Sequence, residues 1–210
     1  MAWLNGAGAE DARAFLARAV RLDDGAVVRL RPAGDDRVTL WSHLPWGVLV
    51  SRGVPGRVAG DHTVLARELL TSLDGDLPTF RDDQWRWSIP GGPGTVVERI
   101  PEADIRRVGA AAADTLRTAA TEGVGGRAVG SRVLRDALLD HVPIVVTTAA
   151  GDRVEITQRL VQAVVRMGFM SSERAGARDF VDVRKFGPWT ALACAYGSAW
   201  HRAAKTLLIG

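Results

Sequence analysis

Two prolines and three glycines fall within six residues, 89–94, and this run constrains the fold more than any other feature of the sequence. Proline fixes a backbone torsion and lacks the amide hydrogen, so neither a helix nor a central strand continues through such a run. The chain of 210 residues is long enough for one or two domains. We therefore predict a linker here, which divides the chain into domains at residues 1–92 and 98–210.

The first half has the periodicity of a helix followed by short strands. Apolar side chains recur at helical spacing over residues 10–22, and Asp61 is placed to cap a second helix that extends to residue 73. Trp85 to Trp87 is typical of one more short strand. Three β-type runs separated by turn residues lie at 26–31, 37–41 and 46–52. This spacing predicts an antiparallel meander within an α-β-β-β-α unit.

The second half mixes helical and strand-like segments. Helices are expected at 102–121, 131–139 and 157–167, and Gly168 with Phe169 fits the left-handed end of the last one. Strands are expected at 144–148, 153–157 and 180–183, whereas 189–200 fits either a helix or a strand. The predicted C-terminal unit is a set of helices packed on a small antiparallel sheet, which makes the whole chain α+β.

Composition and charge exclude several protein classes. Hydrophobic residues make up 47% and charged residues 24%, as in ordinary globular proteins. A single cysteine excludes a disulfide framework and a cysteine-based zinc site. Residues 101–210 carry 15 basic and 11 acidic side chains, an excess too small to indicate a groove that follows phosphates. Nucleic-acid binding through this half is kept as an alternative hypothesis.

The sequence predicts a cytoplasmic protein that does not enter a membrane. The N-terminus has neither the positive segment nor the apolar core of a secretory signal. The longest apolar runs are about five residues, much shorter than a spanning helix requires.

Tryptophan is the most unusual feature of the composition. The chain has seven tryptophans and one tyrosine, and five of the tryptophans lie in the first 90 residues. Trp85 and Trp87 would share one face of a strand, and with Trp41 and Trp46 on neighbouring strands they would form an aromatic interaction surface. The alternative is that the four side chains pack in the core, because a buried indole contributes a large apolar area.

A second candidate site is the glycine-rich segment 125–132. Such a turn exposes free backbone N–H groups at a helix start, where Arg127 and Arg132 could hold an anion beside the capping Ser131. The segment lacks the Gly-Lys-Ser/Thr of a phosphate loop and follows a helix rather than a strand. A flexible connection between two helices is the simpler interpretation.

No group of residues is spaced for catalysis or metal binding. The four histidines are scattered, Cys194 has no base at a recognisable spacing, and Ser198 lacks the glycines of a nucleophile elbow. We expect no metal and no cofactor, and we interpret the chain as a non-catalytic binding module. Its partner would be another protein or a second copy paired at the edge of the meander. An enzyme or small-anion-binding protein using 125–132 is the alternative.

Several segments resemble an uncharacterised family of small two-domain actinobacterial proteins. In the first half these are AFLARAVRLD (14–23), VVRLR (27–31) and LPWGVLV (44–50). In the second half they are VQAVVRMGF (161–169) and YGSAW (196–200). The resemblance implies a two-domain protein of unknown function and assigns no catalytic or binding residues.

Overall fold

The first half of the chain forms four antiparallel strands, two α-helices and a short 3-10 helix. The computed structural model describes residues 3–4, 6–122, 131–171 and 180–202. The elements of the first half are α1 (Gly6–Leu22), β1 (Val27–Pro32), β2 (Arg37–Leu44), β3 (Val48–Pro55), β4 (His62–Leu65), α2 (Ala66–Thr71) and the 3-10 helix η1 (Asp82–Gln84). The three expected meander strands are confirmed, and β1, β2 and β3 pair in sequence order.

The second half supplies three helices and six strands of the described chain. These are β5 (Thr95–Pro101), α3 (Glu102–Glu122), α4 (Ser131–Asp140), β6 (Ile144–Thr147), β7 (Arg153–Ile156), α5 (Gln158–Arg166), β8 (Phe180–Phe186), β9 (Trp189–Cys194) and β10 (Gly197–Arg202). The ambiguous segment 189–200 is thus a hairpin. None of the described helices is long and apolar enough to span a membrane.

The strands of both halves join in one sheet, so the predicted architecture of the second half is wrong. The eight-stranded sheet has the order β4-β1-β2-β3-β10-β9-β8-β5, and every neighbouring pair is antiparallel. The halves meet where β10 pairs with β3, with Trp200 opposite Leu49 and Ser198 opposite Ser51. Among the described strands, only the β6-β7 hairpin forms a separate small sheet. Local periodicity cannot reveal this junction because the paired strands lie far apart in the chain.

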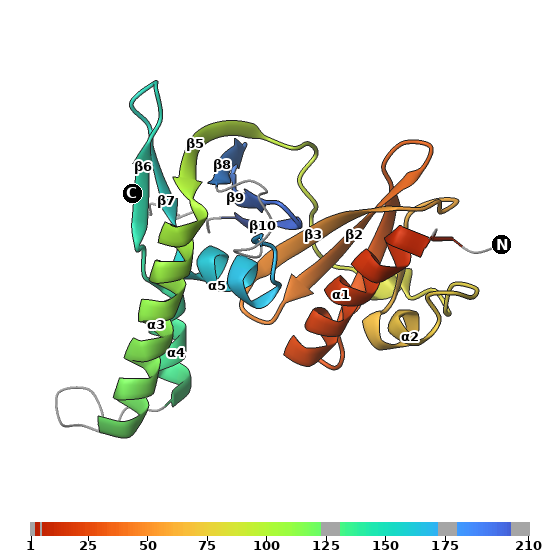
Figure 1. Ribbon diagram of the computed structural model, residues 1–210, viewed down its shortest axis with the longest axis horizontal. Helices are drawn as coiled ribbons and strands as arrows, with labels where there is room; N and C mark the ends of the chain where they lie inside the picture. Colours follow the sequence, from red (N-terminus) through yellow and green to blue (C-terminus); the bar gives the residue numbers. More distant parts are fainter. Residues whose placement is uncertain (1–2, 5, 123–130, 172–179, 203–210) are drawn as a thin grey trace, which may run out of the picture.

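The helices pack against one face of the large sheet. Alternate strand residues such as Leu40, Val50 and Leu192 point to this face and are fully buried with Phe15 of α1 and Leu160 of α5. Figure 1 shows α1 and α5 against the sheet, whereas α3 and α4 lie side by side and extend beyond it. The side chains between these strand positions point to the opposite face, which we call the open face.

The sequence-based prediction is wrong at three places between residues 61 and 101. Asp61 does not cap a helix; the residues after it form β4, and its carboxylate pairs with Arg29 and Arg31 at 3.3 and 3.0 Å. Trp85 to Trp87 is irregular rather than a strand, and β5 was not expected at all. In each case tertiary partners override a weak local preference.

The predicted end of α5 is confirmed. Gly168 has a φ of +61°, its N–H donates to the Val165 carbonyl at 3.1 Å, and the Phe169 N–H donates to the Val164 carbonyl at 3.0 Å. This is the Schellman pattern, in which a left-handed glycine closes the last turn. It brings Phe169 back into the core, where its ring stacks on Phe15 of α1 at 6.3 Å between centroids.

Candidate docking surface

The predicted linker crosses the open face of the sheet. Residues 85–94, which we call the strap, begin beside β1, where the Arg29 guanidinium lies 5.9 Å from the centre of the Trp85 ring. The Trp87 ring stacks on His43 of β2, and the Pro93 carbonyl accepts a hydrogen bond from Arg184 of β8 at 3.4 Å. The proline and glycine residues therefore allow an extended path over the sheet.

The strap completes a cluster of tryptophans on the open face. Trp41 of β2 and Trp200 of β10 are buried, with ring centroids 6.4 Å apart. Trp85 and Trp87 of the strap pack against them and meet each other edge to face, with 5.2 Å between ring centroids. Trp189 of β9 packs against the same cluster. We call these five residues the tryptophan cluster. Both halves of the chain contribute to it, and three of its members are only half-buried.

Three of the four predicted surface tryptophans come together, and the fourth does not. Trp41, Trp85 and Trp87 belong to the cluster, whereas Trp46 lies at the β2-β3 turn on the helix side of the sheet. Its indole N–H donates to the Arg159 carbonyl of α5 at 3.2 Å, and the Arg166 guanidinium lies 5.6 Å from its ring centre.

Trp189 and Trp200 were absent from the sequence-based prediction of this surface. Their positions become informative only once 189–202 is known to be a hairpin paired with β3. Odd and even residues of such a strand point to opposite faces, so Trp200 lies on the same face as Leu49 and Ser198.

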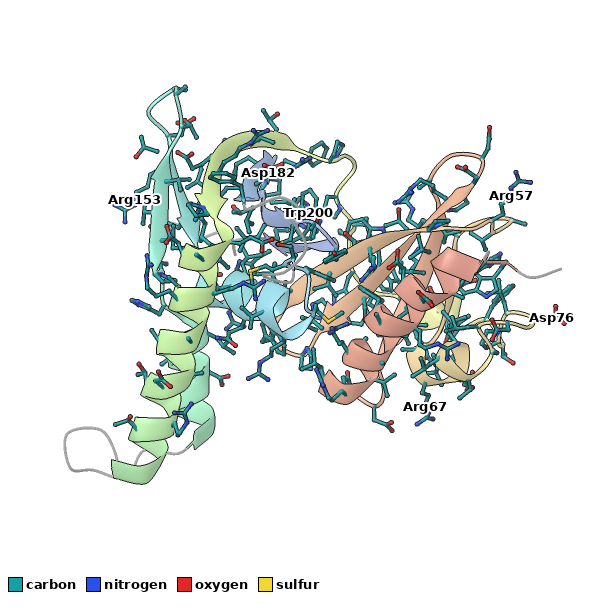
Figure 2. The ribbon with its side chains drawn as sticks, in the orientation of Figure 1. Arg57, Arg67, Asp76, Arg153, Asp182 and Trp200 are labelled. Atoms are coloured by element: carbon teal, nitrogen blue, oxygen red, sulfur yellow. The ribbon has the colours of Figure 1, made fainter. Side chains whose placement is uncertain are left out.

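A hollow of about 300 Å³ opens beside the tryptophan cluster. The sheet provides His43 and Leu49, the strap provides Arg86 and Trp87, and the C-terminal hairpin provides Trp189 and Arg202. Figure 2 shows Trp200 near the middle of the molecule, where the strands of the two halves meet. The hollow therefore exists only because β10 pairs with β3 and the strap passes over both.

His43 forms part of the wall of this hollow as a neutral imidazole. Its ring lies parallel to that of Trp87, with 4.4 Å between centroids and 11° between planes. Burial lowers the pKa of His43 below its ordinary value, so the ring is uncharged at neutral pH. The positive charge of the wall thus comes from Arg86 and Arg202.

The predicted anion site lies largely outside the described residues. Arg127 falls in a segment that the structure does not describe, and the same holds for the side chains of Ser131 and Arg132. Ser131 is the first residue of α4, which agrees with the helix expected at 131–139. The assignment of an anion to these three residues stays a prediction.

The residues considered for nucleophilic chemistry do not form one site. Cys194 faces the helix layer and is buried, and this burial raises the pKa of its thiol. Ser198 lies on the open face with Trp200, because residues two apart in a strand share a face. The sheet itself therefore separates these two side chains.

Two family models match the chain. A domain of unknown function (DUF8185) matches residues 89–206, and a second domain of unknown function (DUF8010) matches residues 3–87. No curated protein matches the chain. The predicted resemblance to an uncharacterised family is confirmed, whereas the actinobacterial origin stays a prediction.

The fold is similar to that of DNA polymerase III β subunits. The subunit from Pseudomonas aeruginosa is 13% identical, with a TM-score of 0.54 over 94% of this chain and 63% of that one. The sliding clamp from Caulobacter crescentus is 11% identical, with a TM-score of 0.55 over 92% of this chain and 63% of that one. The subunit from Thermotoga maritima is 10% identical, with a TM-score of 0.52 over 92% of this chain and 62% of that one. The chain therefore spans somewhat less than two thirds of the length of these proteins. At such identities the similarity establishes the fold alone.

Proposed function

The chain belongs to the family described as a domain of unknown function (DUF8185), and on that premise we propose that it is a protein-interaction module with a clamp-like fold. The tryptophan cluster and its hollow form the proposed partner-binding surface. The structures that share the fold are named as DNA polymerase sliding clamps and β subunits. This supports a role in assembly with other proteins.

The observation that carries the proposal is a half-exposed aromatic surface built by both halves of the chain. Trp85, Trp87 and Trp189 keep part of their indole surface accessible beside two exposed arginines. Tryptophan and arginine are the side chains that most often dominate binding energy at protein interfaces. A surface needed only for stability would bury these rings, as the sheet does with Trp41 and Trp200.

A different protein is favoured over a second copy as the partner. The meander edge is β4, where the Thr63 N–H donates to the Asp82 carboxylate at 2.5 Å and the Thr63 carbonyl accepts the Arg81 N–H at 2.7 Å. The opposite edge, β5, has a register shift between Val96 and Glu98, which hinders pairing with another strand.

The other functional hypotheses gain little support. No described contact supports a small-anion site at 125–132. Nucleic-acid binding is suggested only by the names of the proteins with a similar fold. The arginines on the helix side are mostly in ion pairs, as Arg13 is with Asp74 and Arg159 is with Asp140. Binding of duplex DNA that weakens steeply as salt rises would favour that hypothesis.

Affinity capture of the tagged full-length chain from the cells that produce it tests the proposal. We expect Trp87→Ala and Trp189→Ala each to reduce recovery of the major partner at least tenfold, roughly the effect of removing an interface hot spot. Phe80→Ala is the matched control, because Phe80 is an aromatic side chain 48% exposed that stacks on His62 at the β4 edge.

Two measurements keep this outcome interpretable. Circular dichroism and thermal unfolding establish that each variant is folded before capture. Analytical ultracentrifugation identifies a second copy as the partner if wild type doubles its mass and Trp87→Ala does not. Equal recovery with folded wild-type and tryptophan variants would remove the cluster as the binding surface.

A further inference from the structure

The hollow beside the tryptophan cluster contains a positive charge that no described acidic residue compensates. Arg86 and Arg202 line it and are exposed, and neither makes an ion pair within the described residues. Two other arginines of the open face, Arg99 and Arg184, both contact Asp182, at 3.3 and 2.9 Å, whereas exposed Arg37 of β2 lies outside the hollow and makes no ion pair among the described residues. Arg86 and Arg202 are therefore the guanidinium groups of the hollow that a bound partner can reach.

The hollow also contains an apolar surface between these two charged side chains. Leu49 is buried beneath it, and the rings of Trp87 and Trp189 form two of its sides. The stacking of His43 on Trp87 keeps the Trp87 ring in place and adds a flat neutral surface. A volume of about 300 Å³ is at the small end of ligand pockets and suits one side chain and its polar neighbour.

We propose that this hollow is a docking site for a peptide segment in which an apolar or aromatic side chain adjoins a carboxylate. The apolar side chain packs against Trp87 and Trp189, and the carboxylate accepts hydrogen bonds from Arg86 and Arg202. The planar guanidinium matches a carboxylate in a two-pronged contact, which makes it stronger than a simple ion pair. This inference rests on the proposed function and names the chemistry of the partner.

A peptide accounts for this site better than a nucleic-acid strand. Strand binding requires a basic groove that follows the backbone past several stacking platforms. Here acidic side chains interrupt the positive charge: exposed Asp83 lies in η1, just before the strap, and Asp182 lies on the open face. One hollow with two arginines instead provides for a single anchoring side chain and one or two carboxylates.

Fluorescence anisotropy with the full chain and labelled short peptides tests this inference. The probe is Gly-Ser-Glu-Phe-Asp-Ser-Gly with an amidated end, and its counterparts replace Glu and Asp by Gln and Asn, or Phe by Gly. We expect saturable binding of the probe and at least about tenfold weaker binding of each counterpart, because one lacks the carboxylates that accept charge-assisted hydrogen bonds and the other lacks the buried ring.

The chain offers matched variants for the same measurement. Arg202→Gln and Arg86→Gln should each weaken the probe about tenfold and bring it close to the affinity of the amide counterpart. Arg57→Gln should leave it unchanged, because Arg57 is an exposed arginine at the far end of the molecule from Trp200, as Figure 2 shows. All three side chains are exposed, so the folded state is expected to persist.

Three outcomes would overturn the inference. These are no saturable binding up to about 1 mM probe, equal affinity for the carboxylate and amide peptides, and displacement of the probe by a mixed-sequence single-stranded oligonucleotide at lower concentration than by unlabelled peptide. The last would indicate a nucleic-acid strand as the occupant. If tryptophan-dependent capture succeeds and the peptide test fails, the interaction module stands and only this partner chemistry is wrong.

Discussion

Two half-buried histidines, His43 and His201, make the stability of the protein depend on pH. Burial lowers the pKa of His43 and also that of His201, where Arg159 adds to the effect, and the ordinary value for both is 6.5. The unfolded chain therefore binds these protons more tightly than the folded chain does. The contribution of these neutral histidines to the free energy of unfolding is therefore fully present above about pH 6.5 and is lost as the pH falls below that value.

His43→Gln isolates the contribution of the hollow to this response. In the folded protein His43 faces the ring of Trp87 and shares the hollow with Arg86 and Arg202, so protonation adds a third positive charge there. Between about pH 7.5 and pH 5 we expect the midpoint temperature of thermal unfolding to fall by a few degrees less in the variant than in wild type. His201 retains part of the acid response. Identical pH profiles for the two proteins would contradict this prediction.

At the scale of elements, one buried carboxylate fixes the start of α3. Glu102 follows β5 directly and accepts hydrogen bonds from the Ser171 N–H at 3.0 Å and the Ser171 hydroxyl at 2.8 Å, while Arg106 pairs with it at 3.4 Å. Glu102 and Ser171 are both buried. The contact joins the strand-to-helix turn to the segment that follows α5.

Removal of this carboxylate leaves buried donors without an acceptor. We expect Glu102→Ala to lower the free energy of unfolding by about 3 kcal/mol, measured by urea denaturation. Asp104→Ala is the control from the same helical turn, because its pair with Arg107 is largely exposed and should contribute about 0.5 kcal/mol. Comparable losses in the two variants would show that the Glu102 contacts contribute no more than a surface pair.

At the scale of the whole molecule, the two halves share one sheet and one core. β3 and β10 pair across the junction, and Phe15 of α1 stacks on Phe169 from the second half. The core cluster on the helix side includes buried residues from both halves. The domain boundary at 92–98 stays a prediction, and the described strands on its two sides pair in one sheet.

This continuity predicts one cooperative unfolding transition. Tryptophan fluorescence reports the junction and far-UV circular dichroism reports the helices, so both probes should give the same midpoint in urea. Two separate transitions, one for each half, would show that the β3-β10 pairing contributes little stability.

Local patterns in the sequence determined many of the elements. Apolar spacing predicted α1, α3 and α5, turn residues separated the meander strands, and Gly168 marked the end of α5. These features depend on neighbours within a few residues, where backbone torsions and the alternation of side chains decide the outcome. The number of tryptophans led to the prediction of an aromatic surface, with core packing as the alternative.

Only the tertiary structure decided how these elements combine. Pairing of β10 with β3 joined the halves, and the path of the strap brought Trp87 onto His43 and Arg86 beside Arg202. Such contacts connect residues that are distant in the chain, and each has many competing partners of similar local preference. The burial of both sheet faces together selects one arrangement. The sequence of a single strand or loop does not indicate which arrangement this is.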